Sequence, residues 1–99
     1  MEQPIIEIDY LGGNCPVQAE GTIDGQPFYF RARGDSWSLG IGGDPVGAPA
    51  WERDEVYGVW PDAGWMSEQE AMAFIEAAAM VWKGETFIAS IQEARAASL

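Results

Sequence analysis

The fold is decided by residues 15–41, which read CPVQAEGTIDGQPFYFRARGDSWSLGI. Two dipeptides in this stretch, Asp24-Gly25 and Gly34-Asp35, are typical of the two-residue turns that join antiparallel strands. We therefore expect three consecutive strands joined by two tight hairpins, at about 15–23, 26–33 and 36–41.

The turns also fix how the strands pair, because residues at equal distances from a two-residue turn lie opposite each other. The first hairpin then sets Gly21 against Phe28, and the second sets Phe28 against Ile41. Both hairpins place Phe28 and Phe30 on the same face, which we expect to be buried. Pro27 has no N–H to donate to the last of these strands, so that strand is expected to end near residue 41.

Helix signals follow in the last third of the chain. Ser67 with Glu70 matches a capping box, and apolar residues recur at helical spacing after it. Lys83-Gly84 is typical of a helix end. We therefore expect one long and one short helix, at about 68–83 and 87–97.

The remaining segments complete an α+β fold. Alternating apolar and acidic residues predict a first strand at about 4–11. Residues 42–66 show no sustained periodicity and are expected to form an acidic, aromatic loop. We expect a single domain over residues 1–99, in which a four-stranded antiparallel β-meander packs against the two C-terminal helices.

The chain is strongly acidic, with 16 Asp and Glu residues against five Lys and Arg residues and a formal net charge of -11. Phosphate backbones and anionic lipid surfaces repel such a protein, so neither nucleic acid nor a membrane is expected as a direct partner. The first residues lack the pattern of a signal peptide. Because Cys15 is the only cysteine, no internal disulfide can form, and a reducing cytoplasm is expected.

The sequence lacks the residues on which most enzymes depend. It has no histidine, which removes the usual general base near neutral pH and a common zinc ligand. Its glycine-rich and acidic stretches match neither a phosphate-binding loop nor a calcium-binding loop. Cys15 has no base or cation beside it in sequence and is expected to be structural. We expect no catalytic site, no cofactor and no metal, with a carboxylate-only enzyme as a minor alternative.

Negative charge is concentrated in residues 44–76, which carry eight acidic residues and only Arg53 as a base. Aromatic residues are interleaved with these acids, and an exposed aromatic side chain rimmed by charge is typical of interface hot spots. Trp51 is the expected anchor. The residues expected to bind a partner are Asp44, Trp51, Glu52, Asp54, Glu55 and Asp62. The alternative contact surface is the outer face of the sheet, with Glu7, Asp9 and Glu20.

Two stretches resemble short proteins encoded by bacterial phages and prophages, namely YLGGNCPVQAEGTIDGQPFYFRARGDSWSLGIGG and PDAGWMSEQEAMAFIEAAA. Within that group the chain resembles phage anti-CRISPR proteins, in particular inhibitors of type I-C systems, which block the Cascade surveillance complex before it engages target DNA. The resemblance implies a basic DNA-binding surface as the target. It assigns no role to any individual residue.

These observations lead to the hypothesis of a non-enzymatic anti-CRISPR inhibitor, a monomer in the cytoplasm of the bacterial host. Its acidic surface would mimic DNA, occupy the basic groove of a Cascade complex and block target DNA binding. The alternative is a phage structural or adaptor protein. In that case the acidic surface only keeps the protein soluble, and the aromatic loop docks on another phage protein.

Overall fold

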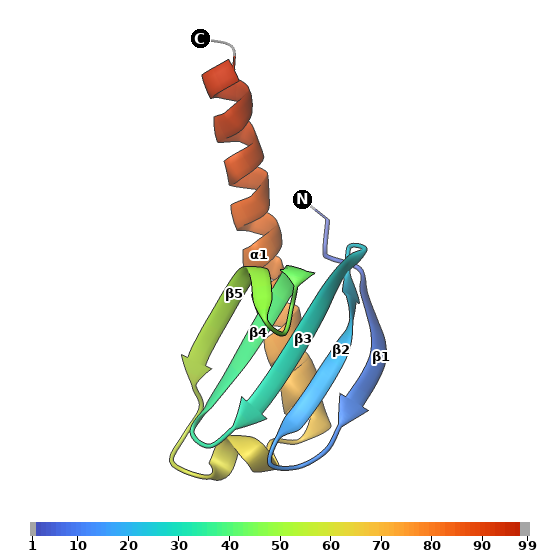
Figure 1. Cartoon of the computed structure of the whole chain (residues 1–99), viewed down its shortest axis with the longest axis vertical. Helices are drawn as coiled ribbons and strands as arrows, with labels where there is room; N and C mark the ends of the chain where they lie inside the picture. Colours follow the sequence, from blue (N-terminus) through green and yellow to red (C-terminus); the bar gives the residue numbers. More distant parts are fainter. Residues whose placement is uncertain (1, 98–99) are drawn as a thin grey trace.

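The computed structural model describes residues 2–97 as an α+β fold, with one antiparallel sheet and one long helix behind it (Figure 1). The five strands follow one another as a meander in the order β1-β2-β3-β4-β5. Their bounds are β1 Ile6–Gly12, β2 Val17–Ile23, β3 Gln26–Arg33, β4 Ser36–Asp44 and β5 Ala48–Val56. A short 3-10 helix, η1 (Asp62–Trp65), and the helix α1 (Glu68–Ala97) follow the sheet.

Both central hairpins have the register that their turns predict. Gly21 lies opposite Phe28 between β2 and β3, and Phe28 lies opposite Ile41 between β3 and β4. Pairing between β3 and β4 stops there, as expected from Pro27. β4 nevertheless continues to Asp44, so the expected end near residue 41 is wrong. The reason is that the other edge of β4 pairs with β5 and supports those last residues.

The sheet has five strands instead of the expected four, because part of the expected loop over 42–66 is the edge strand β5. β5 pairs with β4 through contacts such as Ile41 opposite Trp51 and Ser38 opposite Asp54. An edge strand needs few buried side chains, and charged residues on it discourage pairing with other chains. Its sequence therefore lacks the apolar alternation by which the first strand was predicted, and no two-residue turn signal precedes it.

The rest of the expected loop closes the end of the sheet at which the β3–β4 turn lies. The N–H of Tyr57 donates to the carbonyl of Asp35 at 2.7 Å, and the N–H of Ala63 donates to the carbonyl of Gly34 at 2.9 Å. The Tyr57 hydroxyl donates a hydrogen bond to Glu70, and this contact raises the pKa of the phenol. These bonds join the two ends of the segment to the sheet and to α1.

α1 is one continuous helix, so the expected division into two helices at Gly84 is wrong. Its start agrees with the capping box, because Ser67 Oγ accepts a hydrogen bond from the N–H of Glu70 at 3.1 Å. Gly84 lies inside the helix, which runs on to Ala97. The expected short helix was to cover the sheet, whereas residues 85–97 are exposed and project beyond it (Figure 1).

The core lies between the sheet and the first half of α1. The sheet contributes large buried side chains from its covered face, among them Phe28, Phe30 and Leu39. The helix contributes mainly small residues, so that it approaches the sheet closely; the buried ones are Ala71, Ile75, Ala78 and Ala79.

An ion pair fastens α1 at the point where it leaves the sheet. Lys83 Nζ lies 3.0 Å from Asp24 Oδ2, and Asp24 Oδ1 accepts a hydrogen bond from the N–H of Ile5 at 2.8 Å. The backbone hydrogen bond first, and Lys83 second, hold the pKa of Asp24 below its ordinary value. A carboxylate whose pKa is lowered by folding stabilises the protein above its unfolded pKa, and this contribution is lost as the pH falls through the folded pKa.

Asp24→Asn should therefore lower the free energy of unfolding near neutral pH and have less effect as the pH falls below about 4. The physical reason is that the wild-type carboxylate becomes protonated in this range and loses the same interactions. Urea unfolding of the wild-type chain and the variant, at neutral pH and at about pH 3, measures the difference. An equal destabilisation at both pH values would contradict the electrostatic role of Asp24.

Candidate functional site

α1 covers one face of the sheet (Figure 1). The other face is open to solvent except at Gly40, which is buried because Pro45 and Pro49 of the β4–β5 hairpin lie over it. Because side chains alternate between the two faces along a strand, the register identifies those on the uncovered side, here called the open face. Five residues that pair across the strands form one cross-strand line on this face: Tyr10, Glu20, Tyr29, Gly40 and Glu52. The adjacent cross-strand line consists of Gly12, Gln18, Arg31, Ser38 and Asp54.

The open face carries exposed carboxylates along its two sides. Glu7 and Glu20 lie on β1 and β2, while Glu52 and Asp54 lie on β5. We call these two pairs the acidic rows. Three strand spacings, roughly 14 Å, separate Glu20 on β2 from β5, and four spacings, roughly 19 Å, separate Glu7 on β1 from β5. Asp9, the remaining acid of β1, lies where a bulge shifts the pairing with β2 by one residue.

The floor between the acidic rows carries two arginines. Arg31 and Arg33 project from β3, and in the described part of the chain neither forms an ion pair. Together with Ser38 and Asp54 they line a shallow hollow of about 600 Å³. The open face is thus negative along its sides and positive in its centre, so a basic partner gains most by placing its charges over the acidic rows.

The structure separates the residues that the sequence suggested as a binding site. Glu52 and Asp54 share the open face. Glu55 lies on the other face of β5, where its carboxylate pairs with a neighbouring arginine at 3.0 Å. Asp44 ends β4, whereas Asp62 lies in η1 at the opposite end of the sheet. Of the six residues expected to bind a partner, only Glu52 and Asp54 therefore lie on the outer face of the sheet, which was the alternative contact surface.

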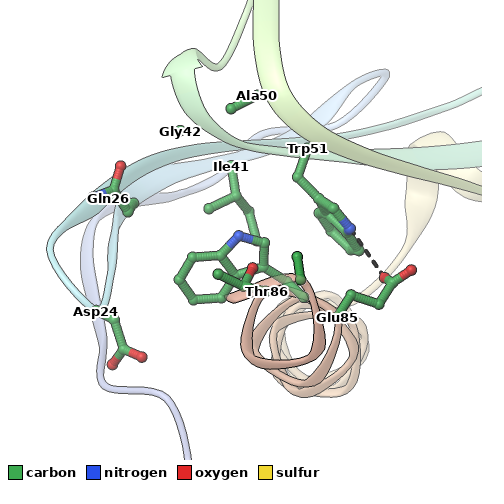
Figure 2. Close-up of a pocket in the computed structure, with 10 residues that line it drawn as sticks. Asp24, Gln26, Ile41, Gly42, Ala50, Trp51, Glu85 and Thr86 are labelled. Atoms are coloured by element: carbon green, nitrogen blue, oxygen red, sulfur yellow. Dashed lines mark hydrogen bonds between the residues drawn. The ribbon is translucent and has the colours of Figure 1, made fainter. Parts of the chain in front are cut away.

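Trp51, the expected anchor, faces α1. Its indole N–H donates a hydrogen bond to Glu85 Oε2 at 3.1 Å, which ties β5 to the helix (Figure 2). Around this bond a cleft of about 630 Å³ lies between the sheet and the point where α1 leaves it, with Ile41 and Trp82 in its lining. A partner that used Trp51 as an anchor would have to break the bond to Glu85.

The tryptophans with the greatest exposure are Trp60 and Trp65, in the segment that closes the end of the sheet. Their side chains are 72% and 64% exposed, and Val59 beside them is also exposed. The ring of Trp60 lies against Gly34 and lines the hollow on the open face. The sequence indicated an aromatic and acidic segment. It could not indicate which aromatic side chains stay at the surface, because that depends on how the segment crosses the sheet.

No three Cys, Asp or Glu side chains within residues 2–97 are placed so that they could hold a metal ion. No helix in the same range is long and apolar enough to cross a membrane. Comparison of the chain with protein-family models, with curated proteins and with solved structures found no match. The function is therefore argued from the geometry and charge of the open face.

Proposed function

We propose that this protein is a non-enzymatic inhibitor of a CRISPR surveillance complex. Its open face binds the basic DNA-binding groove of Cascade in the bacterial cytoplasm and prevents target DNA from entering. A type I-C Cascade is the target to test. The observation that carries the proposal is the pair of acidic rows on the open face of a chain with a net charge of -11.

The spacing of the acidic rows supports mimicry of DNA. The major groove of B-form DNA is about 12 Å wide, and Glu20 lies roughly 14 Å, and Glu7 roughly 19 Å, from the acidic row of β5. Along β5, Glu52 and Asp54 repeat at an interval of roughly 6.7 Å, because they are two residues apart on one strand. Lysine and arginine side chains arranged for two phosphate strands would thus meet carboxylates at comparable separations.

Long-range attraction supports the same partner. Within residues 2–97, Asp24 and Glu55 are offset by the ion pairs already described, while the carboxylates of the acidic rows form no ion pair. An excess of negative charge steers the protein toward a basic groove and raises the association rate, and added salt screens this effect. Binding driven in this way is expected to fall steeply as the salt concentration rises.

The proposal is tested with purified type I-C Cascade, titrated with the protein at low and at high salt. We expect tight binding at low salt, loss of binding at high salt, and exclusion of the protein when target DNA is bound first. Absence of binding at low salt would reject this complex as the target. Binding that persists beside bound target DNA would reject mimicry of DNA at the groove.

The exposure of Trp60 and Trp65 favours a second candidate function, an adaptor that docks on another phage protein. Desolvated tryptophans dominate many interfaces, and burial of their rings depends little on salt. Such a contact would survive high salt and would be weakened by Trp65→Ala, because Trp65 is exposed and does not line the hollow on the open face. The DNA-mimicking inhibitor would instead keep most of its affinity in this variant.

A further inference from the structure

The apolar side of α1 changes direction where the helix leaves the sheet. Before that point, Ala71, Ile75, Ala78 and Trp82 face the core at alternating spacings of four and three residues. After it, the continuation of the same side carries polar residues, including Glu85 and Glu93. The large apolar residues of the projecting part are Phe87, Ile88 and Ile91, which are 56%, 55% and 42% exposed.

These exposed residues continue a longer stripe along α1, whose first members, Ala73, Ala77 and Met80, line a hollow beside Pro4 and Ile6. The stripe follows alternating steps of four and three residues, which is the repeat of a coiled-coil seam. It is here called the outer seam. Its members are exposed apart from half-buried Gly84, and they are Ala73, Ala77, Met80, Gly84, Phe87, Ile91 and Ala94. Within the projecting part the repeat comprises Gly84, Phe87, Ile91 and Ala94, and such spacing is typical of a helix that packs against a second helix.

The distribution of charge along the chain indicates which kind of partner helix can pack against the outer seam. In the described residues beyond 76, Lys83 and Arg95 offset Glu85 and Glu93, so the net charge of -11 lies entirely on residues 1–76. The projecting part of α1, residues 84–97, carries Glu85 and Glu93 against Arg95, a net charge of only -1, so two copies of this chain meet there with little repulsion. A strongly basic partner would instead be drawn to the acidic sheet.

We propose that the protein forms a homodimer in which the projecting parts of two α1 helices pair antiparallel along the outer seam. The antiparallel arrangement places the two acidic sheets at opposite ends of the pair, whereas a parallel one would bring them together. Residues 84–97 give a paired length of roughly 20 Å per chain. This inference replaces the monomer expected from the sequence and is independent of the proposed inhibitor function.

Sedimentation equilibrium over a range of protein concentrations tests the dimer. We expect twice the monomer mass for the wild-type chain, and association weakened at least tenfold by Phe87→Glu and by Ile91→Glu separately. Ala96→Glu, an equal charge change on the exposed helix but outside the seam, should leave association nearly unchanged. A wild-type monomer at every concentration, or a dimer that both seam variants leave intact, would overturn the proposal.

Dimerisation and binding to a basic groove are expected to respond to added salt in opposite directions. Salt screens the repulsion between two acidic sheets and leaves apolar packing in place, so dimerisation should strengthen as salt is added. Circular dichroism checks that each variant keeps its helix and sheet. Dimerisation that weakens with salt would contradict the neutral, apolar seam.

The antiparallel orientation has its own measurement, because labels near the helix ends separate the two arrangements. In a Cys15→Ser background, a spin label is attached at Ala96→Cys, and the distance between the labels of the two chains is measured. An antiparallel pair separates the labels by roughly 18 Å along the helix axis, because residue 96 of one chain lies near residue 84 of the other. Labels side by side would overturn this orientation.

Discussion

Replacement of both Glu52 and Asp54 by lysine should weaken binding to the basic groove roughly a hundredfold. The estimate follows from coupling energies of about 1.5 kcal/mol for each close charge pair across an interface. Each lost ionic contact also lowers the slope of log affinity against log salt by about one, so the slope should fall by about two. Titration of Cascade with wild-type protein and variant at several salt concentrations measures both effects.

A matched control distinguishes the effect of where the charges lie from the effect of the net charge of the protein. Glu76→Lys with Glu93→Lys changes the net charge by the same amount, but both residues are exposed on α1, Glu76 behind the sheet and Glu93 in the projecting part. This control should lose only the long-range steering, which lowers the association rate modestly. Equal loss of affinity in the two double variants would show that total charge alone governs binding, and it would contradict the open face as the site.

Removal of the two arginines in the centre of the open face is expected to change the affinity for a basic groove in the opposite direction. Arg31→Gln with Arg33→Gln removes the positive centre between the acidic rows. If a basic groove covers this face, the variant should bind at least as tightly as the wild-type chain. Weaker binding would mean that the arginines contact an acidic or phosphate group of the partner, which is incompatible with simple mimicry of DNA.

The two central hairpins could be predicted because their register depends on local information. A two-residue turn leaves no freedom in which residues face each other, and Phe28 and Phe30 then identify the buried face without reference to the rest of the chain. The start of α1 was predictable for a similar reason, since a capping box acts within one turn of helix. These parts of the α+β fold are confirmed.

The errors arose at Gly84 and at β5, and the two have different causes. Gly84 after Lys83 is typical of a helix end, yet the helix continues through it, so a local C-terminal signal was overridden. β5 was missed because it lies at the margin of the core, where Glu52, Arg53 and Asp54 follow one another without an apolar alternation. Pairing with β4 explains β5, whereas the residues after Gly84 are exposed and continue the helix without being buried against the sheet.

The candidate site was predicted only in part, because its residues come from strands far apart in the sequence. The acidity of 44–76 was plain, but the side of the sheet to which each acid points depends on the register of β5. That register places Glu52 and Asp54 beside the outer-face alternative with Glu7 and Glu20, and it places Glu55 on the other side. The exposure of Trp60 depends likewise on contacts across the end of the sheet.

Gly21→Ala should lower the free energy of unfolding by about 3 kcal/mol, at the upper end of the usual cost of overpacking. A Cβ at Gly21 would overlap the backbone carbonyl oxygen of Glu7 and lie 3.1 Å from the amide nitrogen of Asp9. Because backbone atoms cannot rotate away as a flexible side chain can, β1 would have to move off β2. The acidic row of Glu7 and Glu20 would be disturbed with it.

Urea unfolding measures the loss of stability, and hydrogen exchange shows whether the amides of β1 are the first to lose protection in Gly21→Ala. Gly25→Asn is the matched control, because no atom lies within 4 Å of a Cβ there, although its φ is +79°. Asparagine tolerates this left-handed conformation, so the control should change the free energy of unfolding by less than about 1 kcal/mol. A Gly21→Ala chain as stable as this control would mean that β1 yields at little cost. The sheet would then hold Glu7 too loosely to keep the acidic rows at a fixed separation.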